Sequence, residues 1–304
     1  KEISMDLLAL VGNTPLISLS HFTEGLDDIT LYGKAEFLNP GGSVKDRAAK
    51  AMLLDGISRG ALTSGKTIID ATSGNTGIAY AMIGAALGYP VELYMPQNTS
   101  IERKQLIRLY GATIIETDPL EGSDGAYLEV QDRVAADPQR YFYPDQYNNP
   151  VNPAAHYAGT GLEIWQQTRQ RVTHFITSMG TSGSFVGTAR RLKDENPQIQ
   201  TLAVQPASPF HGIEGTKHMA TSIRPGILDD GLIDDIVTVT TEEAYATARQ
   251  LVKRNGILTG ISSGANVAAA ARLAATLPRG SVVVTLLCDT GSRYLSDAFW
   301  SQQT

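Results

Sequence analysis

Short apolar segments typical of buried strands alternate with helical patterns along most of this chain, and this alternation limits the possible fold more than any other feature. In the first half, strand-like runs cover residues 67–71, 91–96 and 113–115, and helical patterns cover residues 78–87 and 101–110. In the second half, strand-like runs cover residues 174–178, 201–204 and 281–286, and alanine-rich helical spacing covers residues 267–277. Strands that alternate with helices in this way predict an α/β protein with parallel strands.

A segment rich in turn-forming residues separates the two series. Residues 143–150 read Tyr-Pro-Asp-Gln-Tyr-Asn-Asn-Pro, a composition that favours a crossing between domains. We expect an N-terminal α/β domain over residues 40–148 and a C-terminal α/β domain built from residues 1–39 and 149–304. Residues 87–135 are expected to form a mobile lobe that closes over a bound substrate. The cleft between two such domains is a common place for a ligand site.

The composition is that of a globular protein. The chain has 304 residues, of which 42% are hydrophobic and 18% are charged. Its formal net charge of −6 gives no reason to expect nucleic acid as a partner. We find no run of about 18 apolar residues that could span a membrane, and the single cysteine, Cys288, excludes an intrachain disulfide. We therefore expect a cytoplasmic protein, and the spacing of its histidines predicts no metal site.

Lys45 follows a glycine turn in the segment of residues 39–47, at the point where a helical pattern begins. Small residues precede it in the sequence. A lysine held in this way is suited to form a Schiff base with an aldehyde cofactor. Taken alone, the lysine is better explained as a surface residue in the first turn of a helix, so its neighbours in the sequence decide its role.

Three loops rich in glycine and hydroxyl residues lie where strands would lead into helices, at residues 72–77, 180–184 and 260–264. The N-terminus of a helix presents unpaired backbone N–H groups and the positive end of the helix dipole, so it suits a phosphate or a carboxylate. Each loop taken alone is also explained as an ordinary turn or helix cap. In the first loop, the capping residue would be Ser73 or Asn75.

Lys45 and the three loops together resemble the signature of pyridoxal 5′-phosphate (PLP) enzymes of the tryptophan synthase β-subunit fold family. Within that family the chain resembles the cysteine synthases, and most of all their B branch, from residues 12–16 to residues 291–295. The resemblance implies two three-layer αβα domains with mostly parallel sheets, PLP in the cleft between them, and a homodimer. The segments that carry the resemblance to the B branch are residues 152–157, 161–168 and 288–289.

The resemblance also implies roles for individual residues. Lys45 would be the catalytic residue and would bind the cofactor, Asn75 would contact its ring hydroxyl, and Ser262 would contact its pyridine nitrogen. A neutral serine at that nitrogen favours β-elimination and β-replacement over transamination. Cys288 is expected to be a buried, unreactive thiol beside the ring. The cofactor phosphate would be bound by Gly180, Thr181, Ser182, Gly183 and Ser184. The substrate would be bound by Thr72, Ser73, Gly74, Asn75, Thr76, Gln146 and Gly212.

The implied reaction is a β-replacement in which O-acetyl-L-serine and sulfide give L-cysteine and acetate, or thiosulfate gives S-sulfocysteine. Related alternatives are a cystathionine β-synthase that joins serine and homocysteine, and an O-phosphoserine sulfhydrylase. A threonine or serine dehydratase fits the loops less well. An alternative from another class is a binding protein that keeps the fold without activity. The sequence leaves open the sulfur donor, the leaving group, and whether a serine acetyltransferase binds.

One segment departs from the B branch. After residues 212–213, well-known B-type enzymes carry arginines and a tryptophan, whereas this chain has Glu-Gly-Thr-Lys-His-Met at residues 214–219. Glu214 is expected to repel an anionic sulfur donor, so sulfide is favoured over thiosulfate. A mobile basic loop that faces solvent is an equally good explanation of the nearby cations. The cations that could offset the charge of Glu214 are Lys217, His218 and Arg224, and O-phosphoserine could be admitted through Lys217 or Arg224.

Overall fold

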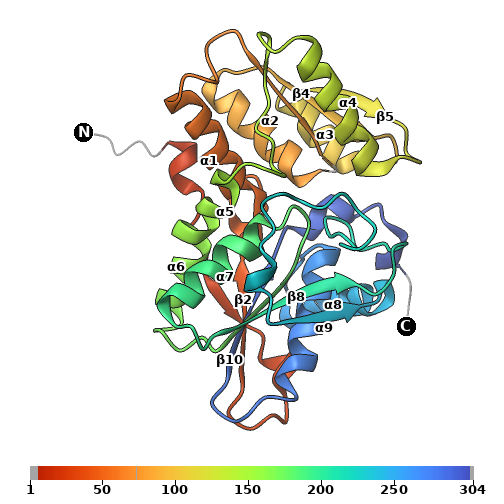
Figure 1. Ribbon diagram of the computed structural model, residues 1–304. Helices are drawn as coiled ribbons and strands as arrows, with labels where there is room; N and C mark the ends of the chain where they lie inside the picture. Colours follow the sequence, from red (N-terminus) through yellow and green to blue (C-terminus); the bar gives the residue numbers. More distant parts are fainter. Residues whose placement is uncertain (1–5, 73, 302–304) are drawn as a thin grey trace.

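The computed structural model describes residues 6–72 and 74–301, which form two lobes, each built around its own sheet (Figure 1). Ser73, one of the predicted substrate-binding residues, lies outside the described residues. The strands are β1 (Leu16–Ser18), β2 (Thr30–Ala35), β3 (Thr67–Ala71), β4 (Val91–Pro96), β5 (Thr113–Thr117), β6 (Tyr141–Phe142), β7 (His174–Ser178), β8 (Gln200–Pro206), β9 (Asp235–Val239) and β10 (Val282–Leu287). The helices are α1 (Lys45–Ser58), α2 (Asn75–Leu87), α3 (Ile101–Leu109), α4 (Gly122–Ala136), α5 (Val151–His156), α6 (Leu162–Gln167), α7 (Gly183–Glu195), α8 (Thr241–Asn255) and α9 (Ile261–Ala274).

The strands of the described residues form two sheets that are almost entirely parallel. The smaller sheet has the order β5-β4-β3-β6, and all of its pairings are parallel. The larger sheet has the order β1-β2-β10-β7-β8-β9, in which β1 alone runs antiparallel to its neighbour. The predicted α/β class with mostly parallel sheets is confirmed. β1 and β2 belong to the larger sheet. The domain boundaries and the mobility of residues 87–135 stay predictions.

Helices cover both faces of each sheet, because successive side chains of a strand point to opposite faces. In β3, Ile68 packs with residues of α1, α2 and α3, whereas the next residue, Ile69, packs with residues of α4. In β10, Val283 packs with α8 and α9, whereas Val284 packs with α7. Both lobes therefore have the three-layer αβα arrangement, and strands buried on both faces explain why they read as continuous apolar runs.

The sequence patterns locate most elements but misplace the polar starts of two helices. α2 begins at Asn75 and α9 at Ile261, where the periodicity indicates residues 78 and 267. The first turns of both helices carry polar and small side chains that line an internal cavity, so they lack the apolar spacing. The patterns do not predict β1, β2, β6, β9, α4, α5, α6 or α8. The last of these begins with a capping box formed by Thr240 and Glu243, a signal that the sequence does contain.

A buried network of ion pairs ties α1 to the larger sheet. In Arg47 of α1, Nε lies 2.7 Å from the carboxylate of Glu36, and Nη1 lies 2.7 Å from the carboxylate of Glu163 in α6. Glu163 also pairs with Lys34 of β2 at 2.6 Å. Lys34 and Glu36 are fully buried. Burial alone would raise the pKa of Glu36, but the charge of Arg47 holds that pKa below its ordinary value.

Replacing Arg47 with methionine is expected to lower the free energy of unfolding by about 3–5 kcal/mol, because Glu36 would be left as a buried charge without its main partner. The midpoint of urea-induced unfolding measures this effect. Arg59→Met is the matched control, because Arg59 pairs with Asp55 and its side chain is 58% exposed. The control should cost less than about 1 kcal/mol, and equal shifts in the two variants would contradict the role given to the network.

Candidate active site

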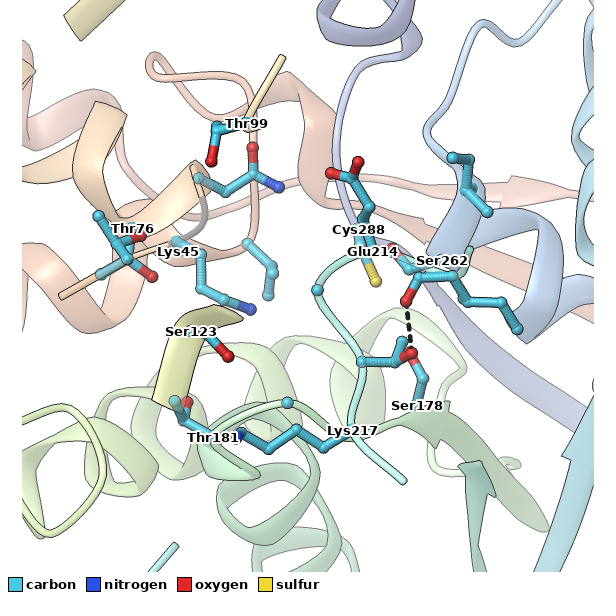
Figure 2. Close-up of a pocket in the computed structure, with 18 of the residues that line it drawn as sticks. Lys45, Thr76, Thr99, Ser123, Ser178, Thr181, Glu214, Lys217, Ser262 and Cys288 are labelled. Atoms are coloured by element: carbon cyan, nitrogen blue, oxygen red, sulfur yellow. Dashed lines mark hydrogen bonds between the residues drawn. The ribbon is translucent and has the colours of Figure 1, made fainter. Parts of the chain in front are cut away.

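A cavity of about 660 Å³ lies between the two lobes, and residues that follow β3, β7 and β10 form part of its wall. Figure 2 shows Lys45, Thr76, Thr181, Ser262 and Cys288 around this cavity, each contributed by a different element or loop. In parallel α/β sheets, ligands bind at the carboxyl ends of the strands. A cavity of this size holds a small molecule with most of its surface buried.

Lys45 is the first residue of α1, and the end of β10 fixes the turn that precedes it. Gly42 in that turn has a φ of 78°, a left-handed conformation that glycine adopts without strain. The N–H of Val44 donates to the carbonyl oxygen of Cys288 at 2.8 Å. The side chain of Lys45 is half-buried and points into the cavity (Figure 2). The backbone therefore delivers the amine of Lys45 to the cavity and not to the outer surface.

The loop of residues 180–184 connects β7 to α7 and forms one wall of the cavity. The hydroxyl of Ser182 is buried and has no hydrogen-bond partner among the described residues. The loop has no room for larger residues, because a Cβ on Gly180 or Gly183 would lie 2.5 Å or 2.0 Å from a neighbouring oxygen. A buried, unsatisfied hydroxyl at a helix N-terminus is a place where a bound anion supplies the missing partner. The residues of this loop that line the cavity are Gly180, Thr181, Ser182 and Ser184.

The loop after β3 presents polar groups to the same cavity, which Thr72, Asn75 and Thr76 line. The hydroxyl oxygen of Thr72 accepts hydrogen bonds from the N–H groups of Gly74 at 3.1 Å and Gly77 at 3.2 Å. Thr72 therefore supplies the hydrogen-bond acceptor for two backbone N–H groups at the start of α2. The alternative in which Asn75 caps this helix is wrong, because its amide binds residues of another segment.

Both ends of the Asn75 amide are held by residues that follow β10. Its Nδ2 donates to Asp289 Oδ2 at 2.7 Å, and its Oδ1 accepts from Arg293. Asp289 is fully buried and also accepts from Tyr294 Oη at 2.6 Å. These bonds fix the direction of the amide, and Nδ2 has a second hydrogen for a ligand. The sequence analysis does not identify Asp289 or Arg293 as site residues, although a polar residue soon after a buried parallel strand is a signal for one.

Gln146 lies beside this loop and is hydrogen-bonded within the protein. Its Nε2 donates to the carbonyl oxygen of Ala71 at 3.1 Å, and its Oε1 accepts from Thr76 Oγ1 at 3.0 Å. Asp70, which lies 3.5 Å from Gln146 Nε2, is fully buried, and burial raises the pKa of its carboxyl to about 8. Gln146 thus lines the cavity as expected and also fixes the hydroxyl of Thr76.

Ser262 and Cys288 lie across the cavity from Thr76 (Figure 2). Ser262 belongs to the first turn of α9, and Cys288 directly follows β10. The thiol of Cys288 accepts a hydrogen bond from Asn266 Nδ2 at 3.3 Å, and burial raises its pKa to about 11. The thiol is therefore protonated at neutral pH, which supports its interpretation as unreactive. Cys288 is half-buried, not buried as expected, because it faces the cavity.

The loop of residues 211–217 lies at the mouth of the cavity, where Gly212, Glu214 and Lys217 line it. A Cβ on Gly212 would lie 2.3 Å from a neighbouring hydroxyl, so this position has no room for a side chain. Glu214 pairs with Arg103 of α3, and Lys217 Nζ pairs with Asp124 of α4 at 2.8 Å. The loop is therefore joined to two helices of the smaller lobe.

Two cations expected to offset the charge of Glu214 lie elsewhere. His218 is hydrogen-bonded to Thr221 through Nδ1 at 2.9 Å, and Arg224 pairs with Asp230 on the exposed surface. Neither residue is part of the cavity wall within the described chain. The expectation that either of them directly offsets the charge of Glu214 is therefore wrong. The charge that pairs with Glu214 is that of Arg103, which no local sequence signal marks.

No group of three or more His, Cys, Asp or Glu side chains in residues 6–72 and 74–301 is placed to hold a metal ion. Over the same ranges, every helix is too short or too polar to cross a membrane. The expected absence of a metal site stays a prediction.

Known proteins match this chain over nearly its whole length. A family model described as "Pyridoxal-phosphate dependent enzyme" matches residues 7–289. A cysteine synthase of Aquifex aeolicus is 52% identical over 302 residues, which cover 98% of this chain and 92% of that protein. Cysteine synthase B of Escherichia coli is 42% identical over 297 residues, which cover 96% and 95%. The crystal structure of a cysteine synthase from Entamoeba histolytica has a TM-score of 0.93 at 35% identity and covers 100% of this chain and 93% of that one.

The buried carboxyl of Asp70 is expected to make stability depend on pH. Its pKa is about 8 in the folded protein, against about 3.9 in an unfolded chain, so the folded state binds this proton more strongly. The free energy of unfolding should therefore fall as the pH rises from about 4 to about 8. Asp70→Asn should reduce this fall, measured as urea midpoints across that pH range. Burial also raises the pKa of Asp46, to about 7, so part of the dependence should persist.

The control for this experiment is Asp55→Asn, which removes a carboxylate from the exposed pair with Arg59. It should leave the pH dependence of the midpoint as in the wild type. If Asp70→Asn and Asp55→Asn show the same slope, Asp70 does not bind a proton in the way inferred.

Proposed function

This chain belongs to the pyridoxal-phosphate-dependent enzyme family, and from that premise we propose that it makes L-cysteine and acetate from O-acetyl-L-serine and sulfide. The observation that carries the proposal is that Lys45, the loop of residues 180–184 and Ser262 meet around one cavity. The similarity to cysteine synthases over nearly the whole chain supports the same reaction. The protein is thus a transferase of amino-acid biosynthesis, and an inactive binding protein would have no need of this set of residues.

The residues around the cavity fit PLP group by group. The unsatisfied hydroxyl of Ser182 and the amide groups at the start of α7 suit a phosphate dianion. The amine of Lys45 suits an aldehyde. The second Nδ2 hydrogen of Asn75 suits a ring hydroxyl, and the hydroxyl of Ser262 suits a pyridine nitrogen. We propose that these residues, with Gly180, Thr181, Gly183 and Ser184, hold the cofactor.

The start of α2 is proposed to bind the carboxylate of the amino acid. Its amide groups and helix dipole favour an anion, and Thr72 and Gln146 hold the loop in shape. Gly212 lines the cavity mouth and would contact the substrate from the other lobe. The residues proposed to contact the carboxylate are Thr72, Ser73, Gly74, Asn75, Thr76 and Gln146.

Lys45 would act as the base of the reaction. The bound cofactor supplies an electron-withdrawing ring, which acidifies the α-carbon of the substrate and allows a β-substituent to leave. The amine of Lys45 takes the α-proton, the bond between Cβ and oxygen breaks, and acetate leaves with the electron pair. The sulfur of hydrogen sulfide then bonds to Cβ and loses its proton to solvent, while Lys45 returns a proton to the α-carbon. In the overall reaction, O-acetylserine and hydrogen sulfide give cysteine, acetate and one proton.

Closure of residues 87–135 over the carboxylate is part of the proposal. Contacts between the lobes support it: Ser100 Oγ donates to the carbonyl oxygen of Arg293 at 3.2 Å, and the N–H of Ser296 donates to Glu102 at 2.8 Å. A carboxylate ligand should therefore protect residues 87–135 from proteolysis. Unchanged protease sensitivity on ligand addition would argue against closure.

A homodimer and a cytoplasmic location complete the proposal. The homodimer follows from the family resemblance, and the location from the composition of the chain. Sedimentation of the purified protein measures the first directly, and a monomer at micromolar concentration would refute it.

Lys45→Ala is expected to lower the rate of cysteine formation by about 100- to 10,000-fold, the range typical of a lost general base. Borohydride reduction should then no longer attach the cofactor to the protein, because the amine that binds it is absent. Lys50→Ala is the matched control, since Lys50 lies on the same helix and donates to the carbonyl oxygen of Leu8 at 2.7 Å. Full activity in Lys45→Ala would overturn the assignment of the base.

Substrate tests separate this function from related activities of the same enzyme family. Cysteine formed from O-acetylserine and sulfide supports the proposal. Product formed only from O-phosphoserine, or only from serine with homocysteine, would assign the protein to another activity of the family.

A further inference from the structure

We propose that the ion pair between Glu214 and Arg103 makes the mouth of the cavity reject divalent oxyanions, so that the enzyme uses sulfide and excludes thiosulfate. This inference rests on the proposed function, because it specifies the class of sulfur donor that the same site accepts. It assigns a selective role to two residues that hold neither the cofactor nor the amino acid.

Arg103 is the cation that an oxyanion entering the cavity would be expected to meet. It lines the cavity from α3, and its side chain is only 4% exposed. Its guanidinium lies over the ring of Tyr294, with Cζ 4.5 Å from the ring centroid. Its Nη1 donates to Glu214 Oε2. A guanidinium binds oxyanions through its N–H donors, and here a carboxylate of the protein already accepts from Nη1.

The backbone around Glu214 is fixed on both sides. The N–H of Gly212 donates to Thr241 Oγ1 at 3.0 Å, and the N–H of Lys217 donates to the carbonyl oxygen of Met179 at 2.8 Å. The N–H of Glu214 itself donates to the carbonyl oxygen of Gly212 at 3.1 Å. The backbone that carries this carboxylate is therefore held in place and is not a freely moving loop.

The other basic residues of the cavity offer no substitute for Arg103. Lys217 pairs with Asp124 at 2.8 Å, and Lys45 is assigned to the cofactor and to the α-carbon of the substrate. Burial lowers the pKa of both His211 and His156, so these rings are neutral at pH 7. Within the described part of the cavity wall, each cation is thus paired or already assigned to another step.

A dianion such as thiosulfate would have to displace Glu214 from Arg103 or lie beside its carboxylate. Both arrangements are unfavourable, since like charges repel strongly where water is partly excluded. Hydrogen sulfide is neutral, and its conjugate base is a small monoanion that needs no guanidinium to hold it. The charge of the donor, more than its size, would therefore decide which one reacts.

The test compares the wild type with Glu214→Gln, with the double variant Glu214→Gln/Arg103→Gln, and with Glu116→Gln. Glu116 of β5 is the matched control. It pairs at 2.9 Å with Lys104, which lies next to Arg103 in α3, and it does not line the cavity. Two quantities are measured for each holoenzyme. The first is the ratio of kcat/KM with thiosulfate to kcat/KM with sulfide, at a fixed concentration of O-acetylserine, and the second is the Kd of thiosulfate by calorimetry.

In Glu214→Gln, the ratio should rise by roughly tenfold or more, which corresponds to about 1.4 kcal/mol, and the Kd of thiosulfate should fall to a similar extent. The double variant and Glu116→Gln should behave as the wild type. An unchanged ratio and Kd in Glu214→Gln would overturn the proposal. An equal gain in the double variant or in Glu116→Gln would also overturn it, as would a wild type that uses thiosulfate as well as sulfide.

The calorimetric measurement separates this inference from the proposed function. If the wild type forms no cysteine from O-acetylserine and sulfide, the proposed function fails. Tighter thiosulfate binding by Glu214→Gln than by Glu116→Gln would then still support the charge inference, and equal binding would still overturn it. Glu214 is 41% exposed, so its replacement leaves the core intact, and Glu214→Ala provides a second variant with the same expected result.

Discussion

Asp289, at the end of the central strand β10, is the residue on which the geometry of the site depends. Its main chain forms a bridge with Ser43, its carbonyl oxygen accepts from the N–H of Gly260 at 3.1 Å, and its carboxylate accepts from Asn75 and Tyr294. One buried residue therefore fixes the turn before α1, the start of α9 and the first residue of α2. Because hydrogen bonds away from water are strong and expensive to lose, these three starts are held in one arrangement.

α1 is held from its other side by the buried ion pairs. Two residues along a helix rotate the side-chain direction by about 200°, so Lys45 and Arg47 point to nearly opposite sides of the first turn. Lys45 faces the cavity, and Arg47 faces Glu36 and Glu163. The buried charges thus lie directly behind the amine of Lys45, where their pairing limits movement of the helix that carries it. The chemistry proposed for Lys45 and the stability of α1 come from adjacent parts of one short segment.

Local signals indicated the single loops that line the cavity, and the resemblance to a known family supplied the roles expected of them. Glycine and hydroxyl residues before helical patterns indicated the loops of residues 180–184 and 260–264, and the family resemblance gave Ser262 its expected role. Contacts between distant segments could not be predicted in this way. Asn75 and Asp289 are 214 residues apart, and Arg103 and Glu214 are 111 residues apart. Nothing in either local sequence specifies the partner, because the partner is set by how the two sheets pack.

The charges of this protein follow a pattern that suits the proposed binding of two anionic groups, a phosphate and a carboxylate, at separate places in one cavity. Arg47, Arg103 and Lys217 are each paired with a carboxylate of the protein. The groups left to meet an anion are amides and hydroxyls at the starts of α2 and α7, as in the buried hydroxyl of Ser182. Such donors act only at hydrogen-bonding distance and in fixed directions, whereas an unpaired cation attracts any anion from farther away. Neutral donors at two helix starts can therefore keep a phosphate and a carboxylate in separate places, and pairing of the cations removes a competing point of attraction between them.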